Sequence, residues 1–206
     1  MRATRFLLLT TAWVMIFATG CKKNAVDQLA FKSALNSYYA PRPECLWTAP
    51  VKFPAQADAS KDEETKTYDA LTDAALLTRK AEEKKRFLIG SKPVNDYDIS
   101  DQGRSFWTQD PSEPGYGNFC YGHPEVAAID SSAPADDSGT RYTVTYHYSV
   151  ASPPAWANSA ETKTAFPKLA AGTSGQQIAT ANLVKTENGW QVQSVQAAPI
   201  PTNPMP

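Results

Sequence analysis

The sequence predicts an α+β protein, in which N-terminal helices with a small β-hairpin precede an antiparallel sheet of three or four strands with a short helix. Apolar residues recur at helical spacing in residues 24–40 and again in residues 62–85. Residues 141–150 instead alternate, with Tyr or Val on one side and Thr, His or Ser on the other, which is typical of a strand with one buried face. Asn188-Gly189 predicts a hairpin, because a type I′ turn needs positive φ at both positions.

Two amphipathic helices and a hairpin are expected in the N-terminal half. The first helix should end before Pro41, and its buried stripe is predicted to be Val26, Leu29, Ala30, Ala34, Leu35 and Tyr38. The second helix, over residues 62–85, is acidic at its start and basic at its end, as the helix macrodipole favours. Its buried stripe is predicted to be Tyr68, Leu71, Ala75 and Leu76. Residues 85–90 and 95–100 predict two short strands.

The second half of the chain is expected to consist mainly of strands. Residues 117–130 predict a strand with an irregular point at His123-Pro124, and a short helix is expected between Trp156 and Phe166. Residues 178–196 contain the hairpin. The segment 198–206 is rich in Pro and cannot form a ladder, so a mobile tail is expected there.

The N-terminus has the pattern of an export signal. Arg2 and Arg5 precede a 13-residue apolar stretch, and small residues follow it before Cys21. A spanning helix would need about 20 apolar residues. The segment Ala18-Thr19-Gly20-Cys21 resembles the lipobox of bacterial lipoproteins, although Ala18 stands where the family usually has Leu. An ordinary secreted protein cleaved nearby is the alternative.

The resemblance to bacterial lipoproteins implies a location. The Cys21 thiol would carry a diacylglyceryl group, and residues 1–20 would be removed as a signal peptide. Residues 21–25 would then be a lipid anchor with a short tether, and the membrane itself would be a partner. In this family Asp after the cysteine marks inner-membrane retention, so Lys22 implies the periplasmic face of the outer membrane. Taken whole, the chain resembles the uncharacterised lipoproteins of Gram-negative bacteria.

Composition and charge limit the partners and the number of domains that the mature chain can have. Without residues 1–20 it has 18 basic and 21 acidic side chains, so nothing in it favours nucleic acid as a partner. Its length fits one domain or two small ones. The predicted organisation is a signal peptide (1–20), anchor and tether (21–25), a helical half with the β-hairpin (26–110), an antiparallel sheet half (111–197) and the tail (198–206).

Cys45 and Cys120 remain once Cys21 is assigned to lipid. In an oxidising compartment two such cysteines are expected to form a disulfide. In the chain-entropy model a loop of about 75 residues stabilises the fold by roughly 4 to 5 kcal/mol, which is an upper figure. Two free thiols or a metal site are the alternatives, but two cysteines without clustered histidines make an incomplete zinc shell.

Part of the N-terminal half resembles the second helix and wing of winged-helix domains. Residues 68–80 would supply the helix, residues 84–90 the hairpin, and residues 96–107 the short helix that follows. This resemblance implies shape alone. Residues 79–86 mix two Glu with the basic side chains, and an exported protein does not meet the chromosome, so no nucleic-acid role is expected.

Catalytic motifs are missing from the sequence. It has no His-Glu-x-x-His, Gly-x-Ser-x-Gly or Ser-x-x-Lys, and no cofactor or metal is expected. The run Asp96, Asp98 and Asp101 lacks the Gly and Glu of a calcium loop. An envelope hydrolase with a site around His123 and Glu125 remains the alternative function.

Aromatic side chains next to turns or prolines give the leading hypothesis. Aromatic residues at a surface anchor partners, but the same residues would serve equally as lids on a small core. The candidates for partner binding are Trp47, Trp107, Tyr116, Tyr121 and Trp156. The sequence therefore favours a non-catalytic envelope lipoprotein that binds another protein, a glycan or peptidoglycan.

Overall fold

The computed structural model of the protein describes residues 21–86 and 90–197, with α1 side chains described from Asp27 onward. Over these residues the chain is mostly β, with eleven strands in three antiparallel sheets, and 27% of it is helical. The elements in chain order are α1 (Cys21–Tyr39), β1 (Glu44–Cys45), β2 (Val51–Lys52), β3 (Ala55–Asp58), α2 (Asp62–Asp73), β4 (Leu77–Arg86), β5 (Gly90–Ile99), η1 (Gly103–Ser105), β6 (Trp107–Gln109), β7 (Tyr116–Gly122), β8 (Pro124–Pro134), β9 (Arg141–Val150), η2 (Ala155–Asn158), α3 (Ala160–Ala165), α4 (Pro167–Gly172), β10 (Gln177–Thr186) and β11 (Gly189–Ala197).

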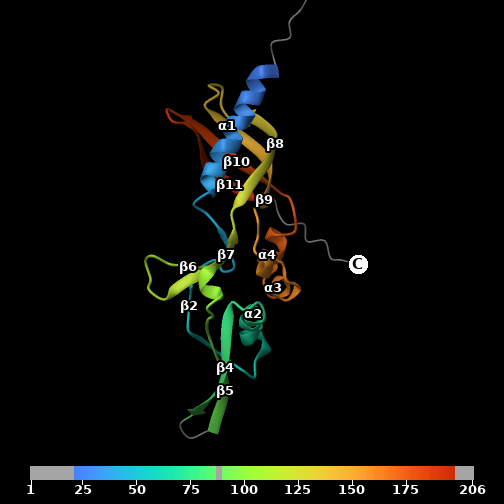
Figure 1. Ribbon diagram of the computed structural model, residues 1–206. Helices are drawn as coiled ribbons and strands as arrows, with labels where there is room; N and C mark the ends of the chain where they lie inside the picture. Colours follow the sequence, from blue (N-terminus) through green and yellow to red (C-terminus); the bar gives the residue numbers. More distant parts are fainter. Residues whose placement is uncertain (1–20, 87–89, 198–206) are drawn as a thin grey trace, which may run out of the picture.

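The molecule is elongated, and three parts follow one another along it (Figure 1). At one end α1 lies across the four-stranded sheet β11-β10-β9-β8, and we call this the α1 lobe. At the other end β4 and β5 pair along ten residues each, with β3 on the second edge of β5 and α2 beside them, and we call this the arm. Between them lies the waist, formed by β1, β2, β6 and β7 with α3 and α4.

The alternating strand predicted at residues 141–150 is β9, and it forms the centre of the α1 lobe. Val144 and Tyr146 are fully buried beneath α1, whereas Thr143 and Thr145 lie on the opposite face of the sheet. The Tyr146 hydroxyl is 2.6 Å from that of Tyr39 at the end of α1. Apolar residues on the covered face and polar residues on the open face are what the period-2 pattern predicts.

α1 presents a different face to the sheet than its sequence pattern predicts. Phe31, Leu35 and Tyr39, spaced four residues apart, are the buried residues, while the expected Leu29 is 71% exposed. Phe31 packs edge-on against Trp190 of β11, with ring centroids 4.9 Å apart. The largest rings therefore set the rotation of the helix, because they bury the most apolar area against the sheet.

The predicted fold class is wrong, and the second helix shows why. α2 ends at Asp73, and residues 77–85, which were expected to continue the helix, lie in strand β4. The turn between them is a Schellman motif: Ala75 has φ of 58°, and the Leu76 amide donates to the Leu71 carbonyl at 2.8 Å. Leu71 and Leu76 are both fully buried.

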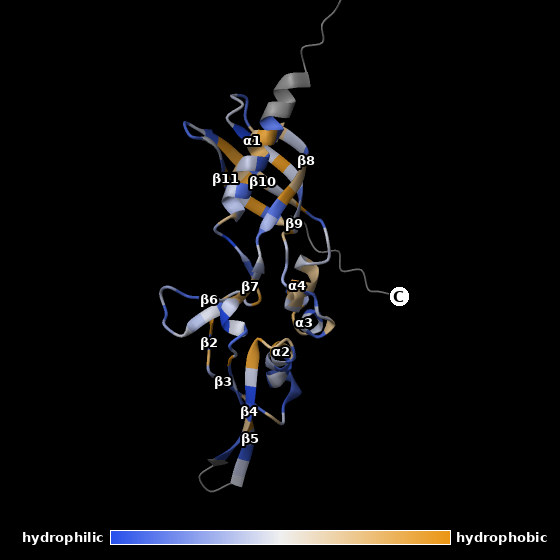
Figure 2. Ribbon diagram, in the orientation of Figure 1, coloured by the Kyte–Doolittle hydropathy of each residue, from blue (hydrophilic) through white to orange (hydrophobic). Residues whose placement is uncertain are grey.

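Tertiary pairing then keeps residues 77–86 extended. β4 pairs antiparallel with β5 over its whole length, which places Lys80 opposite Asp96. The strand is apolar at its start and hydrophilic farther along (Figure 2). A helix-rich N-terminal half followed by one sheet is therefore replaced by three antiparallel sheets, and α1 belongs with the last of them rather than with α2.

The predicted disulfide is confirmed, and it closes the waist. Cys45 of β1 and Cys120 of β7 are opposite one another in the strand register, and their sulfur atoms are bonded. Next to Cys120, Phe119 is fully buried and packs edge-on against Trp107, with ring centroids 5.0 Å apart. The waist core thus forms around β7, with the disulfide at its edge.

Gly122 is where the chain passes from the waist to the α1 lobe. It ends β7 with φ of 142°, a conformation that favours glycine. A Cβ atom on this residue would lie 2.6 Å from Cγ1 of Val150 and 2.8 Å from the carbonyl oxygen of Ala151. β7 ends at this close contact and β8 begins at Pro124, where the sequence predicts an irregular point.

The C-terminal hairpin is confirmed, but its turn differs from the prediction. β10 and β11 close at the pair Thr186 and Gly189, so Glu187 and Asn188 form the loop. Gly189 has φ of 103°, whereas Asn188 is not among the residues of positive φ. The Thr186 hydroxyl accepts the Asn188 amide and donates to the Gly189 carbonyl, which replaces the type I′ geometry.

Reduction of the disulfide should destabilise the waist. In the chain-entropy model, breaking the bond lowers the free energy of unfolding by up to roughly 4 kcal/mol. Each kcal/mol shifts Tm by about 2–4 °C in a chain of this size. We expect a drop in Tm of about 5–15 °C on adding reductant, measured by calorimetry. The double variant Cys45→Ala, Cys120→Ala is the control and should show no further drop. An unchanged Tm in the reduced wild-type protein would contradict the prediction.

Replacing Gly122 by alanine should lower the free energy of unfolding more than replacing a glycine whose Cβ would have no close neighbour. Gly122→Ala adds a steric clash to an unfavourable φ, so we expect a loss of about 2–4 kcal/mol in denaturant unfolding. Gly139→Ala is the matched control, because Gly139 also has positive φ but a Cβ there meets nothing within 4 Å. Equal losses of unfolding free energy in Gly122→Ala and Gly139→Ala would contradict the close packing around Gly122.

Candidate functional site

Two cavities lie beside the disulfide-linked strands β1 and β7 in the waist, and both reach Lys168 of α4. One is an open groove of about 410 Å³, which we call the Trp47 groove. It is lined by Pro43, Cys45, Trp47, Thr48, Pro50, Thr108, Gln109, Asp110, Pro111, Gly117, Asn118, Cys120 and Lys168. These residues come from the segment between α1 and β2, from β6 and the turn after it, from β7 and from α4.

Asn118 of β7 fixes the backbone beneath the indole of this groove. Its side-chain oxygen accepts the Trp47 amide at 3.2 Å, and its side-chain nitrogen donates to the Trp47 carbonyl at 2.7 Å. The Trp47 ring packs edge-on against Phe166, with centroids 5.7 Å apart, and remains partly exposed. One polar side chain therefore satisfies both main-chain groups of Trp47 where no neighbouring strand does.

The groove floor is closely packed and includes the disulfide. A Cβ on Gly117 would lie 2.5 Å from the Thr108 carbonyl oxygen and 2.5 Å from the Trp107 ring, so only glycine fits there. Cys45 and Cys120 are both partly exposed along the groove. Together they hold β1 against β7, and with it the segment that carries Trp47.

The second cavity, the Tyr121 pocket, is smaller and more enclosed. It has a volume of about 190 Å³ and lies at the junction of the waist and the α1 lobe. Its lining residues are Glu44, Tyr121, Tyr148, Val150, Lys168, Ala171, Gly172, Gln177 and Ala197. Sites for small ligands are common at such junctions between separately packed units.

The Tyr121 hydroxyl is the unusual group of this pocket. Tyr121 is 1% exposed, and its Oη has no hydrogen-bond partner. A Cβ on Gly172 would lie 3.1 Å from this Oη, so the hydroxyl is packed against the end of α4. Burial raises the pKa of the Tyr121 phenol, and the Glu44 carboxylate raises it further, so the hydroxyl keeps its proton. Buried hydroxyls normally have a partner, since an unsatisfied one costs about 1–3 kcal/mol.

The other polar groups of the pocket interior are paired. Tyr148 Oη donates to Gln177 Oε1 at 3.1 Å, and burial raises the Tyr148 pKa to about 12. Gln177 Nε2 donates to the carbonyls of Ala171 and Gly172 at 3.3 and 3.0 Å. These bonds tie the start of β10 to the end of α4 and leave Tyr121 as the donor without an acceptor.

The five predicted partner-binding aromatics occupy different environments. Trp156, 6% exposed, and Tyr121 are in the core, whereas Trp47, Trp107 and Tyr116 are partly exposed. The pattern of aromatics beside turns did not distinguish these groups, because prolines and turns also border the waist core. Trp47 and Tyr121 line the two cavities; Glu44, Asn118 and Lys168 have no motif that marks them in the sequence.

His123 and Glu125, the residues of the alternative hydrolase hypothesis, are both exposed where β7 passes into β8. The other histidine, His147, lies on the open face of the α1-lobe sheet with Nδ1 2.7 Å from Asp130. Neither histidine lines the Trp47 groove or the Tyr121 pocket.

No group of three or more Asp, Glu, His or Cys side chains in residues 21–86 and 90–197 is arranged to hold a metal ion. Asp96, Asp98 and Asp101, the acidic run noted in the sequence, therefore do not form such a group.

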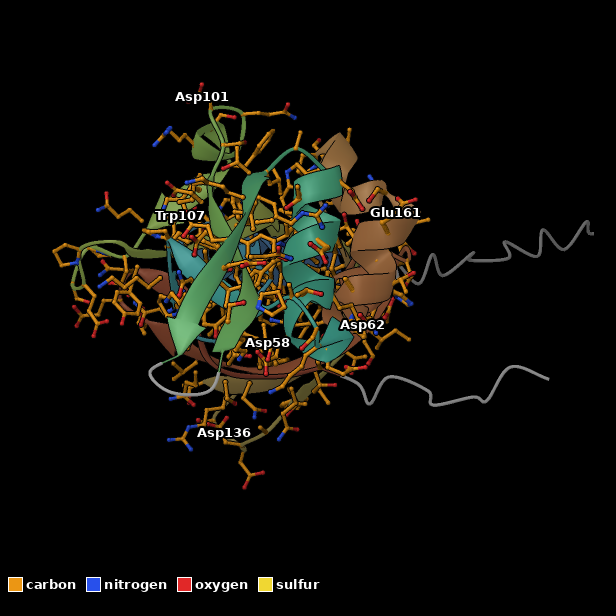
Figure 3. The ribbon with its side chains drawn as sticks, turned by 90° about the horizontal axis from the view of Figure 1, so that it is seen from below. Asp58, Asp62, Asp101, Trp107, Asp136 and Glu161 are labelled. Carbon is orange, nitrogen blue, oxygen red and sulfur yellow. A yellow bond between two sulfur atoms is a disulfide. The ribbon has the colours of Figure 1, made fainter. Side chains whose placement is uncertain are left out.

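Asp58 has a structural role in the middle of the arm, where it lies opposite Val94 of β5. It lies at the end of β3, near the start of α2 (Figure 3), and is almost fully buried. Its carboxylate is 2.6 Å from Lys92 Nζ and accepts from the Ser60 hydroxyl, and these bonds hold the pKa of Asp58 well below its usual range. The ion pair and the turn bond join β3, β5 and the α2 start.

The predicted signal peptide and the mobile tail lie outside the described residues, as does the side chain of Cys21. The helix α1 begins at Cys21. Within the part of the chain that the structure covers, no helix combines the length and the apolar content needed to cross a membrane.

Comparisons with protein-family models, with curated proteins and with solved structures find no match to this chain, so its function is argued from the groove and the pocket themselves.

Proposed function

We propose that the protein is a non-catalytic binding component of the cell envelope, anchored through lipid on Cys21 and holding a partner in the Trp47 groove. The observation that carries the proposal is the groove itself, in which a partly exposed indole, three prolines and a disulfide form a rigid, mainly apolar surface. Aromatic anchors on a rigid scaffold are the usual basis of binding surfaces.

The direction of α1 supports an anchor at Cys21. The 19 residues of the helix from Cys21 to Tyr39 extend about 28 Å at 1.5 Å per residue. Its N-terminal end lies at the opposite end of the molecule from the β4–β5 hairpin (Figure 1). A lipid anchor would hold the α1 lobe nearest the membrane, with the waist and arm extending into the periplasm from the outer membrane.

The chemistry of the groove favours an extended partner, either a segment of an envelope protein or a glycan strand. Both kinds of ligand present apolar faces to an aromatic ring and polar groups along their length. Thr48 and Gln109 are exposed at the groove and offer a hydroxyl and an amide for such groups. The groove is open enough to accept a chain that enters and leaves.

Loss of the Cys21 thiol should abolish anchoring. We expect Cys21→Ser to yield uncleaved or mislocalised protein, because the lipid-transfer step needs the thiol. Intact-mass analysis of the wild-type protein should show an acylated N-terminus at Cys21, and membrane fractionation should compare it with the variant. A mature N-terminus at another residue, without acyl mass, would rule out the anchor.

Photo-cross-linking from the groove should capture the partner. We expect a photoreactive amino acid at Thr48 or Gln109 to give discrete adducts in intact envelopes, identified by mass spectrometry after gel separation. Ser194 is the matched control, because it is also exposed but lies in β11 of the α1 lobe. Adducts that form equally from Ser194, or none from the groove positions, would contradict the proposal.

A further inference from the structure

The last described strand of the chain ends beside the waist. β11 runs antiparallel to β10, so its final residue, Ala197, pairs with Ala179 near the start of β10. The start of β10 is held to the end of α4 by Gln177, whose side-chain nitrogen donates to two carbonyls at that end of the helix. The tail, residues 198–206, therefore begins next to α4.

The Trp47 groove is within reach of this point. Ala197 and Lys168 both line the Tyr121 pocket, and Lys168 also lines the Trp47 groove, so the two cavities share one lysine side chain. In the polyproline II conformation the nine residues of the tail span about 28 Å at 3.1 Å per residue. This span is several times the length of a lysine side chain. The tail is therefore long enough to enter the groove and to lie along it.

The tail has the sequence pattern of a polyproline II ligand. Four of its nine residues are proline, at positions 199, 201, 204 and 206, and none is charged. Proline fixes its own φ near −65° and disfavours a helical residue before it, so an extended segment is predicted. With three residues per turn, Pro201 and Pro204 share one face of this conformation, one turn apart, as in the P-x-x-P ligands of aromatic-lined grooves.

The groove offers the surface that such a segment binds. The partly exposed indole of Trp47 lies in it together with three prolines, and an aromatic ring is the platform on which proline-rich segments dock. Thr48 and Gln109 are exposed at the groove and carry a hydroxyl and an amide that can donate. Polyproline II leaves its main-chain carbonyls without internal partners, so these carbonyls can accept from both side chains.

Attachment to the same chain makes a weak contact sufficient. A short linker gives its segment an effective concentration on the order of 1 mM at a nearby site. If the free segment bound the groove with a Kd of about 0.1 mM, the tethered segment would fill the groove about 90% of the time. A competing partner would then bind about tenfold more weakly, because only the open fraction of the protein is available to it.

We propose that the tail docks in the Trp47 groove of its own chain, with Pro201 and Pro204 against the Trp47 indole, and that it competes there with the envelope partner. The docking itself needs only residues of this chain. The competition rests on the function proposed above for the groove. The tail then sets a threshold, since a partner has to displace it before binding.

Photo-cross-linking in the purified, detergent-solubilised protein tests the docking without a partner present. We expect a photoreactive amino acid at Gln109 to cross-link to residues 198–206 of the same chain, located by mass spectrometry of the digested monomer. Ser138 is the matched control, because it is exposed but lies between β8 and β9 in the α1 lobe, and it should give no such cross-link. A tail cross-link that joins two chains, or none from Gln109, would overturn the docking.

Glycine substitutions in the tail assign the face that makes contact. The double variant Pro201→Gly, Pro204→Gly removes both rings and the preformed extended conformation, so the cross-link yield from Gln109 should fall at least about fivefold. The double variant Pro199→Gly, Pro206→Gly is the matched control, because it loses as many prolines but keeps the Pro201 and Pro204 face. Equal yields in the two variants would contradict the assigned face.

A free peptide measures how far the tail occupies the groove. A labelled peptide with the sequence of residues 198–206, capped at both ends, is titrated into the wild-type protein and both double variants and followed by fluorescence anisotropy. We expect it to bind the Pro201→Gly, Pro204→Gly protein at least about fivefold more tightly than the other two, because that tail no longer competes. The same affinity for all three proteins, or no binding at millimolar peptide, would refute the proposal.

The docking and the proposed function fail in different experiments. In intact envelopes, partner adducts from Gln109 should increase in the Pro201→Gly, Pro204→Gly variant, and an unchanged yield of partner adducts would rule out the competition. If the purified protein gives the cross-link to its own tail but envelopes give no partner adduct, the docking is established and the proposed function, with the competition, is refuted.

Discussion

The antiparallel contact of β1 with β7, locked by the bond between Cys45 and Cys120, is the constraint on which the rest of the structure depends. β1 has two residues and cannot hold its position by hydrogen bonds alone. The disulfide fixes it, and with it Glu44 on one side and the Trp47 segment on the other. Both cavities therefore lie beside one covalent bond that joins residues 75 positions apart.

Patterns that depend on near neighbours were readable from the sequence, and those that depend on distant partners were not. The strand at residues 141–150 needed only its own alternation, and the disulfide was predicted because Cys45 and Cys120 were the two cysteines left once Cys21 was assigned to lipid. Residues 77–86 have a helix-favouring composition, and their extended form comes from β5 and from a left-handed Ala75, where a glycine would have signalled the helix end. The class of the fold was therefore mistaken because one long-range pairing outweighed local preference.

In the candidate site, too, the sequence indicated residue types but not the tertiary contacts that give them a role. Trp47 and Tyr121 were identified as aromatics beside turns, but the sequence could not separate a partly exposed indole from a buried phenol. That distinction follows from packing, because α4 covers Tyr121 while the Trp47 ring faces the groove. Glu44, Asn118 and Lys168 are common residue types in unremarkable contexts, and their roles follow from which strand and helix bring them together.

The switch from helix to strand at Ala75 has a consequence for how stable the arm is on its own. β4 is an edge strand, and among residues 78–84 the side chains of Arg79, Lys80, Glu83 and Lys84 are charged and exposed. Its local preference and its native conformation conflict, which is a form of frustration that natural sequences usually avoid. We therefore expect the outer part of β4 to open at a lower free energy than β9 of the α1 lobe, so that its amide protons exchange with solvent first.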